Sequence, residues 1–320
     1  MSQEIFGIHH ITCIAGDAQE NLDFYAGVLG MRLVKRSVNQ DAPDTYHLFY
    51  ADGEGTPGTD LTFFPWPNMN RAQDGTGLTV EVSLAVPAGS LSYWKQRLQD
   101  RGIRADEAET RFGEAALPFG DPHGLRLALV ETGDERNFVP WPQSPVPAEF
   151  QVRGLHCVRL WERSLAPTAA LLSLMGLELV GEEDGWHRYG VSGGGSGKII
   201  DIQELPQQAR GRQGVGGVHH VAWRTRDAEE EMAIRSVIER VGLQPTSLID
   251  RFWFESVYFR EPGGVLFELA TDGPGFGVDE DAAHLGEKLV LPPWLEAQRP
   301  IIEAGLPPLQ MPNSTGEVSQ

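Results

Sequence analysis

The chain has 320 residues, a length that suits about two domains and is sufficient to bury a large core. Its formal net charge of −19 argues against nucleic acid and anionic membrane surfaces as partners, because both would repel it. The two cysteines, Cys13 and Cys157, lie in apolar strand-like runs, which argues against a disulfide framework. No secretory signal and no apolar run of roughly 18 residues is seen, so we expect a cytoplasmic protein.

Module 1 (residues 1–70) is predicted to contain one helix and four strands. Gly7–Thr12 is a β-type apolar run that carries two adjacent histidines and predicts the first strand. A helix is expected over Asp17–Leu29, because its apolar residues recur at helical spacing and Gly30 follows as a stop. The remaining strands are expected around Arg32–Ser37, Tyr46–Tyr50 and Asp60–Phe64.

Modules 2 (residues 77–135) and 3 (residues 150–206) show the same order of elements. In module 2, strand Leu78–Val86 precedes a helix over Ser90–Arg101, and Leu125–Val130 is the last strand. In module 3 a helix ends near Gly176, and the expected strands are Leu155–Leu160, Glu178–Val180, Trp186–Val191 and Lys198–Ile202. The glycines at 193–195 are predicted to form a hairpin tip, since no helix follows them as a phosphate loop would require.

Module 4 (residues 214–272) repeats module 2 without a net insertion. Residues 77–131 align with residues 217–271 at a constant offset of 140, given by 217 − 77. Matched residues include glycines and an arginine, as in the pairs Gly102 and Gly242, Arg111 and Arg251, and Gly124 and Gly264. The chain therefore holds four β-α-β-β-β units, followed by a C-terminal extension over residues 273–320 with a short helical piece at Pro292–Leu306.

Internal duplication lets one module serve as a control for another. The positions that could hold a metal in modules 1 and 4 carry His10, Thr62, His220 and Glu268. The corresponding positions of modules 2 and 3 carry Val80, Ala128, Cys157 and Asp201, which are not a metal-ligand set. We therefore expect modules 1 and 4 to lie side by side around a metal site, and modules 2 and 3 to form a degenerate one.

The ligand set itself follows from the buried carboxylate. Glu268 lies in the middle of the apolar strand Val265–Leu269, where an unpaired carboxylate costs several kcal/mol. Two imidazoles and one carboxylate with open positions are the facial ligand set of non-haem Fe(II) oxygen chemistry. Since neighbouring strand residues point to opposite faces, one histidine of each His-His pair is expected at the ion. His10 and His220 are predicted because each precedes an aspartate by seven residues.

Several stretches resemble the vicinal oxygen chelate superfamily, whose paired β-α-β-β-β modules form half-barrels. Its opening signature is matched by His10-Ile11-Thr12, Asp17, Phe24-Tyr25 and Leu29-Gly30. Within the superfamily, the chain is most similar to dioxygenases that cleave hydroquinone and chlorohydroquinone rings, on the stretches Gly7–Thr12, Tyr46–Tyr50, Thr62–Trp66, Arg260–Gly264, Thr271–Phe276 and Gly286–Pro293. The resemblance implies an α+β fold of two paired-module half-barrels.

The resemblance also implies a site and substrates. Fe(II), or alternatively Mn(II), would be held by His10, His220 and Glu268, and the substrates would be a small aromatic diol and O₂. Residues beside the metal or facing the substrate would be His9, Thr12, His219, Arg251 and Tyr258. The ring substituents and the oligomeric state, a homo-oligomer included, stay open.

Other interpretations compete with this one. Arg111 matches Arg251 in the degenerate half, so both arginines could simply brace the fold, and His47 is expected to serve the core or a turn. The acidic run Asp279–Asp281 and His284 are expected to be solvated surface. A glyoxalase-type isomerase would need a fourth protein ligand where Thr62 stands. A binding protein of the same fold would carry no metal, and fold alone does not decide between these functions.

Overall fold

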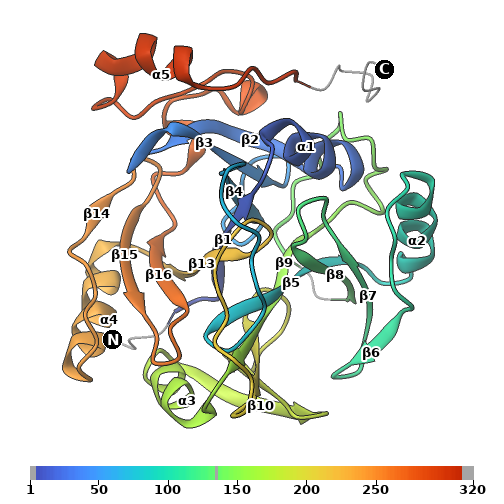
Figure 1. Ribbon diagram of the computed structural model, residues 1–320, viewed down its shortest axis with the longest axis vertical. Helices are drawn as coiled ribbons and strands as arrows, with labels where there is room; N and C mark the ends of the chain where they lie inside the picture. The colour runs from blue at the N-terminus through green and yellow to red at the C-terminus, as the bar shows by residue number, and fades with distance from the viewer. Residues whose placement is uncertain (1–4, 134–135, 312–320) are drawn as a thin grey trace.

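The computed structural model describes residues 5–133 and 136–311, which form two eight-stranded sheets with helices packed against them (Figure 1). The first sheet contains β1 (Ile8–Ala15), β2 (Arg32–Asn39), β3 (Ala42–Ala51), β4 (Asp60–Pro65), β13 (Val218–Thr225), β14 (Ile249–Asp250), β15 (Glu255–Arg260) and β16 (Leu266–Thr271). The second contains β5 (Leu78–Pro87), β6 (Glu109–Arg111), β7 (Glu114–Gly120), β8 (Arg126–Thr132), β9 (Gly154–Glu162), β10 (Leu177–Glu183), β11 (Trp186–Val191) and β12 (Ile199–Glu204).

Each sheet is built from two modules that meet through their first strands. The strand orders are β14-β15-β16-β13-β1-β4-β3-β2 and β10-β11-β12-β9-β5-β8-β7-β6. The first and last strands of a module pair in parallel, as β1 with β4 and β13 with β16, whereas β1 pairs with β13 and β5 with β9 antiparallel. Modules 1 and 4, which lie far apart in the sequence, thus share one sheet. The predicted α+β fold of two paired half-barrels is confirmed.

The helices cover the outer faces of the sheets, as α2 and α4 do in Figure 1. They are α1 (Ala18–Leu22), α2 (Leu91–Asp100), α3 (Leu165–Leu174), α4 (Ala228–Arg240) and α5 (Arg299–Gly305), with short helical turns η1 (Asp23–Val28), η2 (Phe276–Val278), η3 (Ala282–His284) and η4 (Glu296–Gln298). Within the described residues, none of these helices has the length and apolar character needed to cross a membrane.

The helix predicted over Asp17–Leu29 is α-helical only in its first part and continues as a π-helix. After α1 the chain continues as η1, a wider π-type turn in which the backbone N–H of Leu29 donates to the carbonyl of Phe24 at 2.9 Å. Phe24 and Tyr25 are both buried there. The aspartate that follows each predicted histidine ligand is an N-cap, because Asp17 accepts from backbone N–H groups of α1 and Asp227 from one of α4. The seven-residue spacing that both modules share is therefore the distance along the chain from a residue on the first strand to the N-cap of the following helix.

The C-terminal extension lies across module 1, where Figure 1 shows α5 above β2 and β3. Lys35 of β2 is fully buried and forms ion pairs with Asp279, at 2.7 Å, and with Glu280. The expectation that the acidic run is solvated surface is therefore wrong for these two carboxylates. A buried ammonium group needs compensating charge, and only the folded chain brings it there. His284 is exposed, as expected, with 69% of its side chain accessible.

Candidate metal centre

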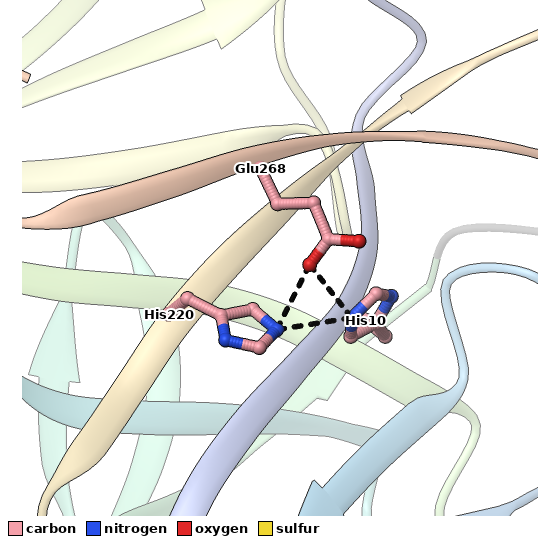
Figure 2. Close-up of side chains that lie close together, drawn as sticks. All are labelled: His10, His220 and Glu268. Carbon is pink, nitrogen blue, oxygen red and sulfur yellow. Dashed lines mark hydrogen bonds and ion pairs between the residues drawn. The ribbon is translucent and has the colours of Figure 1, made fainter. Parts of the chain in front are cut away.

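Three side chains from adjacent strands converge inside the first half-barrel. His10 lies on β1, His220 on β13 and Glu268 on β16, and Figure 2 shows their polar atoms pointing to one spot. Nε2 of His220 lies 2.9 Å from Oε2 of Glu268, and Nε2 of His10 lies 3.3 Å from both. All three side chains are buried. Among the described residues, they are the one group of three or more His, Cys, Asp or Glu side chains whose ligand atoms are close enough to share a metal ion.

The arrangement fits a divalent cation. Three ligand atoms bound at right angles, each about 2.1 Å from an ion, lie about 3.0 Å from one another, close to the separations observed here. Oε2 of Glu268 is buried, yet no hydrogen bond of good geometry reaches it. A buried carboxylate oxygen in this position is compensated by a cation between it and the imidazole nitrogens. The chain can therefore hold a metal ion at His10, His220 and Glu268.

A second histidine adjoins each of the two converging histidines. Nδ1 of His9 lies 2.9 Å from Nδ1 of His10, and Nδ1 of His219 lies 2.8 Å from Nδ1 of His220. Only His10 and His220 join the group of three, as strand alternation predicts. Burial and the neighbouring imidazole lower the pKa of His9 and of His219 to about 3, so both rings are uncharged at neutral pH. Each outer ring is thus placed to accept a hydrogen bond from the inner one.

The carboxylate of Glu268 is fixed by a residue that the sequence analysis missed. Ser256 on β15 is fully buried, and its hydroxyl donates to Oε1 of Glu268 at 2.6 Å. Burial alone would raise the pKa of Glu268, but His10 and His220 hold that pKa well below its usual range. Module 2 has Ala116 at the place of Ser256, so comparing the modules at this position could have pointed to the serine.

A cavity of about 520 Å³ opens beside the three side chains. Of the five further site residues predicted from sequence, His219, Arg251 and Tyr258 line it, whereas His9 and Thr12 do not. The rest of the wall is mainly aromatic and aliphatic and includes Phe49, Phe64, Trp66, Ile249, Trp253, Phe254 and Leu266. The turn between β2 and β3 contributes Asn39, Gln40, Asp41 and Ala42.

Thr12 reaches the cavity wall through two further residues. Its hydroxyl lies 2.8 Å from that of Thr62, which in turn lies 2.9 Å from Nε2 of His47. His47 lines the cavity, so the expectation of a core or turn role is wrong. Burial is the main cause that lowers the pKa of His47 well below its usual value, and the neighbouring His10 lowers it further. His47 and Phe49 are two residues apart and therefore lie on the same face of a strand, and this pairing of a histidine with an aromatic residue could have indicated a cavity-lining role.

Arg251 and Tyr258 form the polar side of the cavity. Nε of Arg251 donates to the hydroxyl of Tyr258 at 3.3 Å, and the guanidinium makes a two-point contact with Asp41 at 2.9 and 3.3 Å. The matched arginine in the degenerate half, Arg111, instead pairs with Glu81 and Glu109 inside its own module. Equivalent arginines therefore have different partners, which separates Arg251 from a bracing role shared by both halves.

The second half-barrel is closed by ion pairs where the first has its candidate metal centre. Arg188 makes a two-point contact with Asp201, at 2.7 and 3.0 Å, and also contacts Glu114 at 2.7 Å. Cys157, at the position of His10, is buried, and burial raises the pKa of its thiol well above the usual value. The carboxylate of Asp201 is thus engaged by an arginine, as the prediction of a degenerate half implies.

Comparisons with known proteins agree with this geometry. Residues 7–129 match the model of the glyoxalase/bleomycin resistance protein/dioxygenase superfamily. The chain is 43% identical over 312 residues to MhqO of Bacillus subtilis, a protein named provisionally as a ring-cleaving dioxygenase, covering 97% of this chain and 99% of MhqO. It is 34% identical over 308 residues to chlorohydroquinone/hydroquinone 1,2-dioxygenase of Sphingobium indicum, covering 92% and 94% of the two chains.

A solved structure extends the likeness to three dimensions. The crystal structure of a provisionally named dioxygenase from Bacillus subtilis superposes with a TM-score of 0.92 at 42% sequence identity, covering 97% of this chain and 99% of the other. The similarity therefore spans both half-barrels. The chain belongs to the glyoxalase/bleomycin resistance protein/dioxygenase superfamily, also called the vicinal oxygen chelate superfamily, and its relatives there include proteins named as ring-cleaving dioxygenases.

Proposed function

We propose that this chain is an Fe(II)-dependent, extradiol-type dioxygenase that inserts O₂ into a hydroquinone- or catechol-type ring. The observation that carries the proposal is the convergence of His10, His220 and Glu268 at the wall of an aromatic-lined cavity. The name of the Sphingobium relative supports a hydroquinone substrate. Two imidazoles and one carboxylate suit Fe(II), with Mn(II) as the alternative.

Bound through these three ligands, the metal would bring substrate and O₂ together at its open positions and pass charge from one to the other. The protein's part is to keep the ligands in the binding form. A neutral imidazole that binds a metal through Nε2 carries its proton on Nδ1. His9 and His219, at 2.9 and 2.8 Å from those Nδ1 atoms, would accept that hydrogen bond and fix the tautomer of His10 and His220.

The polar wall would serve the reacting ring. Burial raises the pKa of Tyr258, as does Glu268, so Tyr258 stays a neutral phenol at physiological pH. Its oxygen accepts a hydrogen bond from Arg251, and as a neutral phenol it would donate its O–H to a substrate oxygen. Arg251, Tyr258 and the uncharged ring of His219 thus line the cavity as donors toward negative charge that develops on the ring oxygens.

A glyoxalase-type isomerase is the first rival. Four protein ligands would be required, and the fourth position holds Thr62, whose hydroxyl is engaged by Thr12 and His47. A neutral threonine bonded in this way supports a three-ligand site with open positions for exogenous ligands. Turnover of a hemithioacetal under nitrogen would favour the isomerase. Failure to retain iron or manganese after anaerobic reconstitution would favour a binding protein instead.

The test is anaerobic loading with Fe(II), followed by oxygen uptake with a panel of hydroquinones and catechols. We expect uptake that is stoichiometric with ring opening, and loss of uptake in His10→Ala, His220→Ala and Glu268→Gln. Asp201→Asn is the matched control, since Asp201 is also a buried strand carboxylate but lies in the closed half-barrel. Loss of uptake in the control, or its retention in Glu268→Gln, would refute the assignment of the site.

A further inference from the structure

The cavity beside the three converging side chains has an unusual balance of charge. Of its lining residues in the described part of the chain, only Arg251 carries a permanent positive charge. The guanidinium of Arg251 is in turn matched by the carboxylate of Asp41, with contacts at 2.9 and 3.3 Å. Apart from the proposed metal ion and its ligands, the wall therefore carries one cation matched by one anion.

Asp41 is held in that position by the turn on which it lies. The side chain of Asn39 accepts a hydrogen bond from the backbone N–H of Asp41 at 2.9 Å, and the amide of Gln40 donates to the backbone carbonyl of Arg251 at 2.9 Å. The backbone N–H of Arg251 donates to the carbonyl of Phe254 at 2.9 Å. Both partners are thus anchored through their backbones, and the pair joins module 1 to module 4 at the cavity wall.

Stability does not account for the pair. The side chain of Asp41 is 75% exposed and that of Arg251 is 16% exposed, so solvent screens the carboxylate and the pair adds less to folding than a buried pair would. The fold does not require it either, because the matched Arg111 of the degenerate half pairs with Glu81 and Glu109 of its own module. Asp41 is supplied by a different module from the arginine it neutralises. A role in ligand selection remains, since both residues line the cavity.

Size does not restrict the ligand to a bare ring. A cavity of about 150 Å³ is enough to bind benzene, whereas this one measures about 520 Å³. A carboxylate group on the ring would therefore fit in the space available. Electrostatics decides instead: with the open positions of the metal taken by the ring oxygens and O₂, a ring carboxylate would have to pair with Arg251, where it would meet the negative charge of Asp41.

We propose that Asp41 determines charge specificity, so that the site accepts uncharged hydroquinones with apolar substituents and rejects rings that bear a carboxylate. The aromatic and aliphatic wall, which includes Phe49, Trp66 and Phe254, receives the apolar substituent. Removing the charge of Asp41 while keeping its shape leaves Arg251 as an unneutralised cation at the cavity wall. Carboxylated rings then gain a partner, and uncharged rings do not. This inference rests on the proposed ring-cleaving function.

The test compares methylhydroquinone with 2,5-dihydroxybenzoate in the Fe(II)-loaded enzyme. The measured quantity is the ratio of kcat/KM for the carboxylated ring to kcat/KM for the uncharged one. Asp41→Asn is expected to raise this ratio about tenfold, equivalent to about 1.4 kcal/mol, chiefly by lowering KM for the carboxylated ring. Asp41→Glu keeps the charge and should keep the wild-type ratio. Asp44→Asn, at an exposed aspartate on β3 that does not line this cavity, is the control and should also leave the ratio unchanged.

Equilibrium binding of the same two ligands under anaerobic conditions separates the two proposals. If both ligands bind and neither is turned over in air, ring cleavage is refuted, while the ratio of dissociation constants still reports charge selection. An unchanged ratio in Asp41→Asn, in binding or in turnover, overturns the role of Asp41. An equal rise in Asp41→Glu would overturn it too, because the effect would then come from shape and not from charge.

Discussion

Loss of the charge on Lys35, the ion-paired lysine under the C-terminal extension, is predicted to destabilise the fold. Lys35 is fully buried, and its ammonium group contacts Asp279, Glu280 and the backbone carbonyl of Phe276. Lys35→Met keeps most of the apolar stem and removes the charge. Two carboxylates then face each other in a site from which water is largely excluded, since their side chains are 17% and 9% exposed. The variant should therefore be strongly destabilised.

Removing one partner of a buried ion pair costs about 3–5 kcal/mol, and the partial exposure of Asp279 places this case near about 3 kcal/mol. Urea denaturation would measure the loss in the free energy of unfolding. The surface variant Lys95→Met is the control, because Lys95 and its partner Glu107 have side chains 50% and 91% exposed. Breaking such an exposed, solvent-screened pair should leave the free energy of unfolding nearly unchanged.

Lys35→Met should also weaken substrate binding in the cavity. Asp279 also accepts a hydrogen bond from Nε1 of Trp253 at 3.2 Å, and Trp253 lines the cavity wall. We expect KM for the ring substrate to rise in Lys35→Met while kcat for the fraction that remains folded changes little. Adding Asp279→Asn and Glu280→Gln should restore part of the stability, since no uncompensated charge would remain. A loss below about 1 kcal/mol in Lys35→Met would refute the reasoning.

Two further predictions concern single carboxyl groups. Ser256→Ala removes the 2.6 Å hydrogen bond to Oε1 of Glu268 and should weaken Fe(II) binding about 10- to 100-fold in an anaerobic titration; unchanged affinity would show that the serine does not orient this ligand. Glu162 is buried, and burial, reinforced by Glu261, raises its pKa to about 8 from the usual 4.5. Its contribution to stability is therefore complete below about pH 4.5 and is lost as the pH rises through 8. Glu162→Gln should lose less stability than the wild type when thermal unfolding is compared near pH 4.5 and above pH 8, and an equal loss in both proteins would contradict the assigned pKa.

Much of the architecture was predictable from sequence, because repetition is visible without coordinates. The constant offset between residues 77–131 and 217–271 exposes the module, and its apolar periodicity and glycine stops predict the strands and most of the helices. The metal-binding candidates were predictable for a related reason. Glu268 is a charged residue in an otherwise apolar strand, whereas the matched position of module 2 is Ala128. The carboxylate is therefore a feature of module 4 and not of the repeat.

The contacts that complete the site were not predictable in this way, because each joins segments far apart in the chain. Asp41 meets Arg251 across 210 residues, and Lys35 meets Asp279 across 244. His47 and Ser256 look ordinary until strand pairing places them beside Thr62 and Glu268. Sequence by itself determined the modules and three ligand candidates, since those depend on local periodicity and burial. Only the tertiary structure decided which carboxylates and hydroxyls surround them, because antiparallel pairing of β1 with β13 brings modules 1 and 4 together.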